Sequence, residues 1–184
     1  MNCLIILRKL PLMILFISIA SSSHAKEQFP STYKSSGEEM VLKGTGTKRV
    51  FLMKAFVAGL YSDDTVEAKD VLTNVPKRIE VSYFVNIPGE KLTKYTERMM
   101  EKNTTPQTLA MLEEQIKLMG KYFVDLKPGD RYALTYLPQT GTEFEYNGKV
   151  VGVIAGEDFA HALFSVWIGK NPMDKTIKNK ILGL

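Results

Sequence analysis

Apolar and polar residues alternate in several short parts of the chain, and this pattern predicts β-strands. It is clearest in residues 78–87, where every second residue would share one face of a half-buried strand: Ile79, Val81, Tyr83, Val85 and Ile87. Other apolar stretches predict strands at residues 40–42, 50–61, 132–136, 142–146 and 149–155. Asn147-Gly148 separates the last two and favours the positive φ angles of a tight hairpin. Residues 26–36 are polar and carry no such pattern, so we expect an irregular segment there.

Between these strands the apolar period changes to that of a helix. In residues 105–123 Thr105 can cap the helix and Pro106 suits its first position. The apolar residues then follow at steps of three and four: Leu109, Leu112, Ile116, Met119 and Phe123. Further helices are predicted at residues 89–102, 157–168 and 174–182, of which the second is apolar almost all round and should be buried. Strands joined by hairpins, with helices segregated along the chain, predict an α+β domain with an antiparallel sheet covered on one face by helices.

The first 25 residues have the three parts of a secretory signal peptide. Arg8 and Lys9 precede an apolar run over residues 10–20, and Ser23-His24-Ala25 places small residues at positions −3 and −1 of a cleavage site. The run is shorter than the roughly 20 residues of a membrane span, and an uncleaved anchor is the alternative interpretation. We therefore expect a signal peptide at residues 1–25 and one domain at residues 26–184. We expect the protein to be exported, with the periplasm as its compartment, and to have no stable membrane span after cleavage.

The composition excludes several classes of site. The single cysteine, Cys3, lies in the expected signal peptide, so the domain can form no disulfide or thiolate metal site. Of two histidines only His161 lies in the domain, which argues against a histidine-based metal site, and no nucleophile elbow accompanies it. The net charge of +4 falls to +2 without Arg8 and Lys9, and the remaining cations are scattered. We therefore expect no cofactor and no nucleic-acid partner.

The stretch Gly-Thr-Gly-Thr-Lys at residues 44–48 is the most unusual local sequence. A P-loop would need a different spacing and a following helix, whereas here a strand is expected to follow. Lys48 and Arg49 are neighbours, and neighbouring side chains on a strand point to opposite faces. Only one of the two can therefore face a given side of a sheet, unless a bulge changes the register. A pair of solvated cations at a strand end is the alternative to a ligand role.

Short sequences through nearly the whole domain resemble the bacterial, exported branch of the chalcone isomerase-like family. They stand in the family's order and at its spacing: Leu42-Lys-Gly-Thr-Gly-Thr-Lys48, Phe56-Val-Ala-Gly-Leu-Tyr61, Pro76-Lys-Arg-Ile79, Leu126-Lys-Pro-Gly-Asp130, Gly141-Thr142, Asp158-Phe159, Phe164-Ser-Val-Trp-Ile-Gly169 and Ile181-Leu-Gly183. The resemblance implies an open-faced β-sandwich, in which a large antiparallel sheet carries a layer of helices and the ligand cleft lies between them. The enzymes of the family close a flavanone ring without a cofactor, and a related plant branch binds fatty acids.

The resemblance also implies where ligand-binding residues should lie. In the enzymes an arginine at the fifth position of a G-x-G-x-R motif neutralises the developing negative charge. Here that position holds Lys48, and Arg49 comes one residue later. A lysine can hold an anion, but it lacks the rigid planar fork of arginine. The position that supplies a strand hydroxyl in the enzymes corresponds to Phe56.

The first helix of the enzymes supplies a tyrosine and an asparagine. These positions fall near Lys91 and Arg98 here, with Tyr95 as a possible replacement for the tyrosine, and the hydroxyl of a late helix falls near Ala160. The alternative for Tyr95 is core packing beside Leu92, and for Arg98 a solvated helix face. Losing several polar groups aimed at one charge removes most of the preorganisation that catalysis needs.

Three functions remain open at this point. The first is a non-catalytic binding protein that holds an apolar or amphipathic ligand, such as a fatty acid with its anionic end, between sheet and helices. Its candidate ligand-binding residues are Lys48, Arg49, Phe56, Tyr95 and Arg98. The second is an intramolecular lyase or isomerase that acts on an enone-like substrate. The third is a structural or interaction role in the cell envelope, with the cleft filled by side chains.

Overall fold

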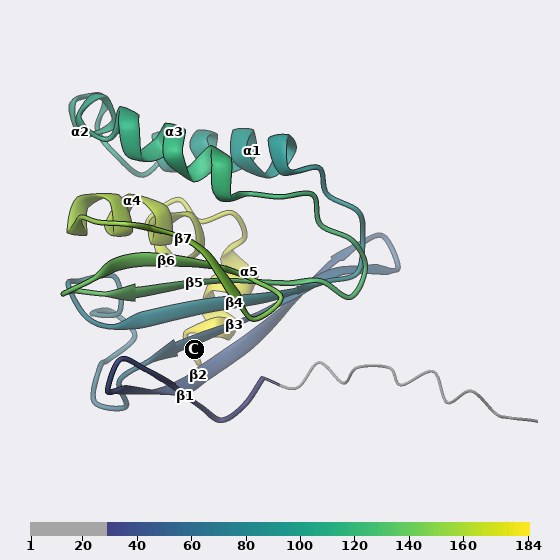
Figure 1. Cartoon of the computed structure of the whole chain (residues 1–184). Helices are drawn as coiled ribbons and strands as arrows, with labels where there is room; N and C mark the ends of the chain where they lie inside the picture. Colours follow the sequence, from purple (N-terminus) through teal and green to yellow (C-terminus); the bar gives the residue numbers. More distant parts are fainter. Residues whose placement is uncertain (1–28) are drawn as a thin grey trace, which may run out of the picture.

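The computed structural model of the protein describes residues 29–184, so the expected signal peptide lies outside the described residues. Seven strands form one antiparallel sheet in which each strand pairs with the next along the chain (Figure 1). The strands are β1 (Thr32–Ser35), β2 (Glu38–Val50), β3 (Met53–Ser62), β4 (Lys77–Tyr83), β5 (Arg131–Leu137), β6 (Gly141–Tyr146) and β7 (Lys149–Ile154). Asn147 and Gly148 have the positive φ angles predicted for the β6–β7 hairpin. The predicted antiparallel α+β architecture is confirmed.

The helices pack on one face of this sheet, as Figure 1 shows for α1 to α4. They are α1 (Gly89–Glu101), α2 (Pro106–Met111), α3 (Glu113–Tyr122), α4 (Glu157–Ile168) and α5 (Lys175–Ile181). Nine residues of α4 are buried, as its all-round apolar character predicts. None of the helices among residues 29–184 is both long and apolar enough to span a bilayer.

The prediction of one continuous helix over residues 105–123 is wrong. Thr105 caps α2 and Pro106 begins it, but α2 ends at Met111 and α3 begins at Glu113. Leu112 between them has a ψ angle of 5°, outside the helical range. Its side chain is buried in the core, as are those of Met119 and Phe123. The apolar period continues across the break between α2 and α3 because these residues pack in the same core. The period alone therefore does not reveal that the helix is interrupted.

The N-terminal part of the sheet is more regular than its sequence predicts. The segment expected to be irregular contains β1, which turns into β2 through Ser36 and Gly37, both at positive φ. The expected strand at residues 40–42 is only part of β2, which continues through residues 44–50. The expected strand over residues 50–61 is divided, because the chain turns at Phe51 and Leu52. The glycine-rich stretch is therefore the interior of a strand and not a turn.

The glycines of this stretch allow α5 to lie directly on β2. A Cβ atom at Gly44 would lie 2.2 Å from the carbonyl oxygen of Lys180, and one at Gly46 would lie 3.1 Å from a methyl carbon of Ile177. Glycine inside a strand normally weakens it and marks a close backbone approach. Here the close approach is that of α5, which buries Ile177 and Ile181 against the sheet.

The opposite face of the sheet carries a buried group of charges. The Arg78 guanidinium donates to both carboxylate oxygens of Glu145, at 3.0 and 3.1 Å, and to Glu80 at 3.0 Å. The ring of Tyr33 from β1 covers this guanidinium at 3.9 Å. Burial opposes the charge of Arg78, but Glu145 and Glu80 raise the pKa of Arg78 above its ordinary value. The β1 segment therefore covers an ion-paired face, whereas the helices cover the apolar one.

We predict that Gly44→Ala lowers the free energy of unfolding by about 3 kcal/mol, the upper part of the range for overpacking, because the clash is with the helix backbone. Urea denaturation followed by circular dichroism measures this change. Thr45→Ala is the matched control, since Thr45 lies on the same strand with its side chain exposed, and it should cost less than about 1 kcal/mol. Equal losses from both substitutions would contradict the proposed contact.

Candidate functional site

An apolar cavity of about 200 Å³ lies between the sheet and helices α1 and α4. Its lining comes from β3, β4, the segment before α1, α1, α4 and the segment before α5: Phe56, Tyr83, Ile87, Lys91, Leu92, Tyr95, Thr96, Val166, Trp167 and Met173. A smaller cavity of about 30 Å³ adjoins it over the centre of the sheet, and the two share Tyr83, Leu92, Thr96 and Trp167 as walls. The site is therefore the sheet–helix cleft.

Strand register brings the aromatic walls of the cavity together. Phe56 on β3 pairs with Tyr83 on β4, so both side chains point to the helix face, and their ring centroids are 6.1 Å apart. Trp167 from α4 meets Phe56 edge-on at 5.8 Å. On α1 Leu92 and Thr96 are four residues apart and therefore share the face that looks toward the sheet.

The cavity has few polar groups, and they lie at different depths. Tyr83 is buried, and burial raises the pKa of its phenol well above the ordinary value, so the hydroxyl stays protonated and can donate a hydrogen bond. Thr96 is also buried. Lys91 and Tyr95 are exposed and stand at the rim. The site can therefore hold an apolar chain inside and a negative group at its entrance.

The structure gives Lys48 a different neighbour from the one that the family resemblance implies. Its Nζ atom lies 2.7 Å from Oδ2 of Asp174, the residue that caps α5. The other oxygen of Asp174 accepts hydrogen bonds from the amides of Thr176 and Ile177. The Lys48 hydrogen bond, with help from these amides, lowers the pKa of Asp174 below its ordinary value. Lys48 is not among the residues that line the cavity.

The register of β2 changes directly after Lys48. Lys48 pairs with Phe56 and Arg49 with Lys54, so Ala55 is an additional residue on β3. Arg49 is exposed near the hairpin turn, where its guanidinium lies 3.5 Å from the carbonyl oxygen of Leu52. Because side chains alternate along β2, Lys48 lies on the helix face with Phe56 and Arg49 points away from the cavity; the additional residue lies on β3 and does not change this order.

Of the five candidate residues, Phe56 and Tyr95 line the cavity, whereas Lys48, Arg49 and Arg98 do not. Arg98 is on the exposed side of α1. A ligand contact for any of the five stays a prediction. The sequence contained signals for lining residues outside that set. Tyr83 shares the strand period of Ile79, and Lys91 stands near a position where the enzymes have a polar group.

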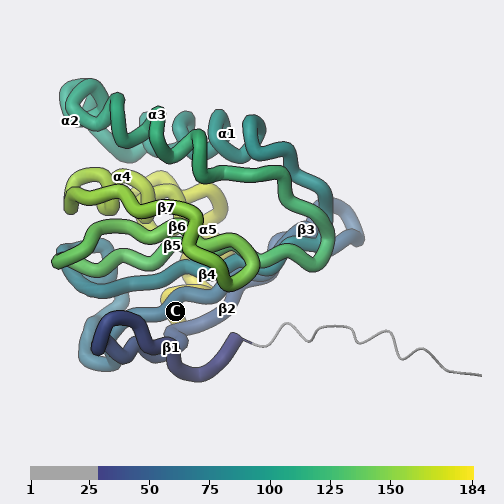
Figure 2. Tube along the Cα trace, in the orientation of Figure 1, coloured from purple at the N-terminus to yellow at the C-terminus, as the bar shows by residue number. Residues whose placement is uncertain are grey.

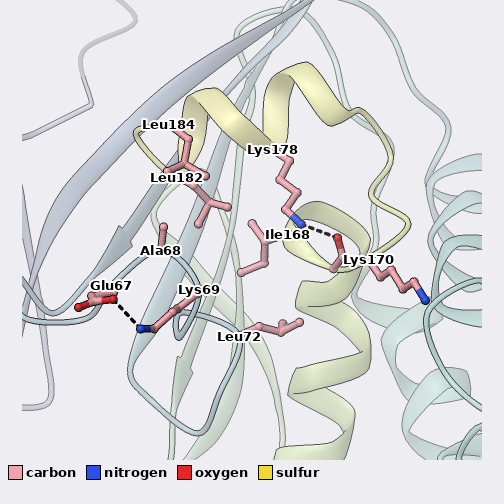
Figure 3. A pocket seen from close by; sticks show the side chains of 10 residues that line it. Glu67, Ala68, Lys69, Leu72, Ile168, Lys170, Lys178, Leu182 and Leu184 are labelled. Atoms are coloured by element: carbon pink, nitrogen blue, oxygen red, sulfur yellow. Dashed lines mark hydrogen bonds and ion pairs between the residues drawn. The ribbon is translucent and has the colours of Figure 1, made fainter.

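A second, more open hollow of about 490 Å³ lies between the β3–β4 loop, the end of α4 and α5 (Figure 3). Its lysine side chains bind other groups of the protein or point away from the hollow. Lys69 pairs with Glu67 at 2.9 Å, and Lys178 donates to the carbonyl oxygen of Gly169 at 2.8 Å. Lys170 points away from the hollow in Figure 3. We therefore regard the apolar cavity of about 200 Å³ between the sheet, α1 and α4 as the better ligand site.

Comparisons with known proteins bear on the family and the fold of the chain. A family model described as chalcone isomerase-like matches residues 21–183. Among solved structures, the chain is similar to a fatty-acid binding protein of Arabidopsis thaliana, with a TM-score of 0.65 and 15% sequence identity. The similarity covers 84% of this chain and 91% of the plant protein, and it shows that the two share a fold. A search of curated protein sequences finds no match.

We predict that Asp174→Asn costs at most about 1 kcal/mol of unfolding free energy at neutral pH, since asparagine keeps the helix cap and loses only the partly exposed ion pair. Asp174→Ala, which also removes the cap, should cost about 1–2 kcal/mol. Because the pKa of Asp174 is lowered on folding, the ionic contribution is present above the ordinary carboxyl pKa and is lost as the pH falls through the lowered value.

Urea denaturation at neutral and strongly acidic pH tests this assignment. The difference between wild type and Asp174→Asn should disappear in acid, where the carboxyl group is protonated. A difference of the same size at both pH values would show that the pairing with Lys48 contributes nothing.

Proposed function

The chain belongs to the chalcone isomerase-like family, and we propose that it is a non-catalytic protein that binds a fatty-acid-like ligand in the cavity between β3, β4, α1 and α4. The observation that carries this proposal is the combination of an apolar interior with a lysine at the entrance. The acyl chain would lie against Phe56 and Trp167, and its carboxylate would lie near Lys91 at the rim. Lys91 thus takes the place of the cation expected at Lys48.

The plant protein of the same fold supports this ligand class, because it is described as a fatty-acid binding protein. The size of the cavity narrows the class. A volume of about 200 Å³ is below the range of roughly 300–1,000 Å³ that is typical of sites for drug-sized ligands. A short or medium acyl chain fits this volume, whereas a longer chain would have to displace Leu92 or Trp167 to reach the adjoining small cavity.

The surroundings of Lys48 argue against the isomerase alternative. The enzymes place a cation where negative charge develops, and a cation stabilises that charge only if it is held free for it. Here the Nζ atom of Lys48 is 2.7 Å from the Asp174 carboxylate, which also caps a helix. We therefore expect no turnover of chalcone. Cyclisation that Lys48→Ala abolishes would favour the enzyme instead.

We also propose that the protein is exported and works in the periplasm. The support is the order of charge, apolar run and small residues in its first 25 residues. A ligand with an apolar chain is poorly soluble in such a compartment, and a carrier that encloses the chain would keep it in solution.

We predict that affinity for straight-chain fatty acids rises about fourfold for each added CH₂ group while the cavity still has room, and then levels off. Isothermal titration calorimetry with a series of chain lengths measures this dependence, and native mass spectrometry of detergent-free protein shows any ligand that is retained. Protein that is consistently empty and binds no member of the series would refute the proposal.

We predict that Lys91→Gln weakens carboxylate binding by up to about fivefold, because the lost interaction is an ion pair at an exposed rim. Affinity for the corresponding fatty alcohol should not change. Lys94→Gln is the matched control, since Lys94 is exposed on the same helix and is paired with Glu90 rather than facing the cavity. An equal effect of both substitutions would mean that Lys91 has no specific role.

A further inference from the structure

The turn between β2 and β3 exposes four consecutive large apolar side chains. Phe51 and Leu52 at the tip are 94% and 93% exposed, Met53 is 66% exposed and Val50 is 47% exposed. Figures 1 and 2 show this hairpin projecting past the end of the sheet. Single exposed apolar residues are common on soluble proteins, but a contiguous group of this kind marks an interaction site.

Neither core packing nor the geometry of the turn explains large apolar residues at this position. Phe51 has a φ angle of +54°, a conformation that is costly for a bulky residue and natural for glycine or asparagine. A turn with Asn-Gly at its tip would avoid this cost. The tip therefore carries a backbone cost that a binding role explains.

The charges of Arg49 and Lys54 define the kind of surface that would fit the tip. Two cations stand immediately behind an apolar wedge, and the ammonium group of Lys54 also lies 4.9 Å from the ring of Phe84. Apolar side chains that enter the boundary between headgroups and acyl chains, with cations at headgroup level, are the pattern of proteins that bind anionic lipid surfaces.

A protein partner fits the tip less well. A stable interface takes about 800 Å² from each partner, whereas the largest residue of the tip buries about 150–250 Å² and the other three are smaller. A narrow wedge of two turn residues suits insertion into a fluid surface better than docking on a flat one.

The tip is also close to the entrance of the cavity. Phe56, which lines the cavity, is only three residues beyond Met53 on β3, a distance of about 10 Å along a strand. The amide of Phe84, on the segment that leads to α1, donates to the carbonyl oxygen of Ala55 at 2.9 Å. The base of the hairpin is therefore bonded to the segment that carries Ile87 and Lys91 to the rim.

We propose that the β2–β3 hairpin docks the protein on an anionic lipid membrane, with Phe51 and Leu52 inserted and with Arg49 and Lys54 at the level of the headgroups. Docking places the cavity entrance beside the membrane surface, from which an amphipathic ligand can enter. This inference goes beyond the proposed ligand binding, and the docking step itself does not depend on it.

Flotation with vesicles tests the proposal. The full chain, purified without detergent, is mixed with vesicles of phosphatidylcholine alone or of phosphatidylcholine with phosphatidylglycerol. Wild type should bind the anionic vesicles more tightly, and added salt should weaken that binding.

Phe51→Ser with Leu52→Ser should reduce binding at least about tenfold, because the two side chains supply most of the inserted area. Arg49→Gln with Lys54→Gln should reduce binding to anionic vesicles by about fivefold per charge, and binding to neutral ones much less.

The matched control is Val150→Ser with Val153→Ser, which removes two exposed apolar side chains from β7 at the opposite edge of the sheet. It should bind vesicles like wild type, and all variants keep the same N-terminal segment. Equal vesicle binding by wild type and the tip variant would overturn the proposal, as would a wild-type dimer that the tip variant dissociates without any vesicle binding. Fatty-acid binding in solution is measured on the same variants, and its failure in all of them would overturn the proposed function but not the docking.

Discussion

The backbone of α5 lies directly on β2, at a separation that only glycine at position 44 permits. This contact fixes the part of the molecule that matters for the site. It brings Asp174, the cap of α5, to Lys48, and it holds the segment that leads from α4 back to the sheet. On that segment the amide of Met173 donates to the carbonyl oxygen of Val166 at 2.7 Å, and both residues line the cavity beside Trp167. The packing of one short helix on one strand thus shapes one wall of the ligand site.

Lys48, Arg49 and the apolar tip that follows them are neighbours in the sequence but have different roles in the structure. Lys48 forms an ion pair with Asp174, the residue that caps α5, so its charge is neutralised within the fold. Arg49, the next residue of β2, points outward, and the chain then reaches an apolar tip that contributes nothing to the core. The lysine at the rim of the cavity is Lys91, which comes from α1. The alternation of side chains along β2 therefore separates a structural charge, Lys48, from a surface charge, Arg49.

Most of the fold could be predicted from the sequence, because periods of two and of 3.6 residues report directly on which face is buried. Helix α4, the Asn147-Gly148 hairpin and the position of strand β4 follow from such local patterns. The half-buried strand expected over residues 78–87 is wrong in extent and burial, because β4 ends at Tyr83 and all seven of its residues are buried. The strand through residues 44–50 could not be recognised, since its glycines are explained only by a helix that lies more than 130 residues later. The site was predictable in part, from the family resemblance rather than from these periods. Phe56 and Tyr95 line the cavity, but the partner of Lys48 is 126 residues away and no local pattern identifies it.

Trp167 can report most directly whether an acyl chain lies in the cavity between sheet and helices. It is the only tryptophan of the chain, and it is a wall of both cavities. Bromine on a fatty-acid chain quenches tryptophan fluorescence only at short range. We predict saturable quenching of Trp167 fluorescence by a chain-brominated fatty acid of medium length, reversed by the same acid without bromine. Binding that calorimetry detects without any quenching of Trp167 would place the ligand elsewhere and contradict binding in this cavity.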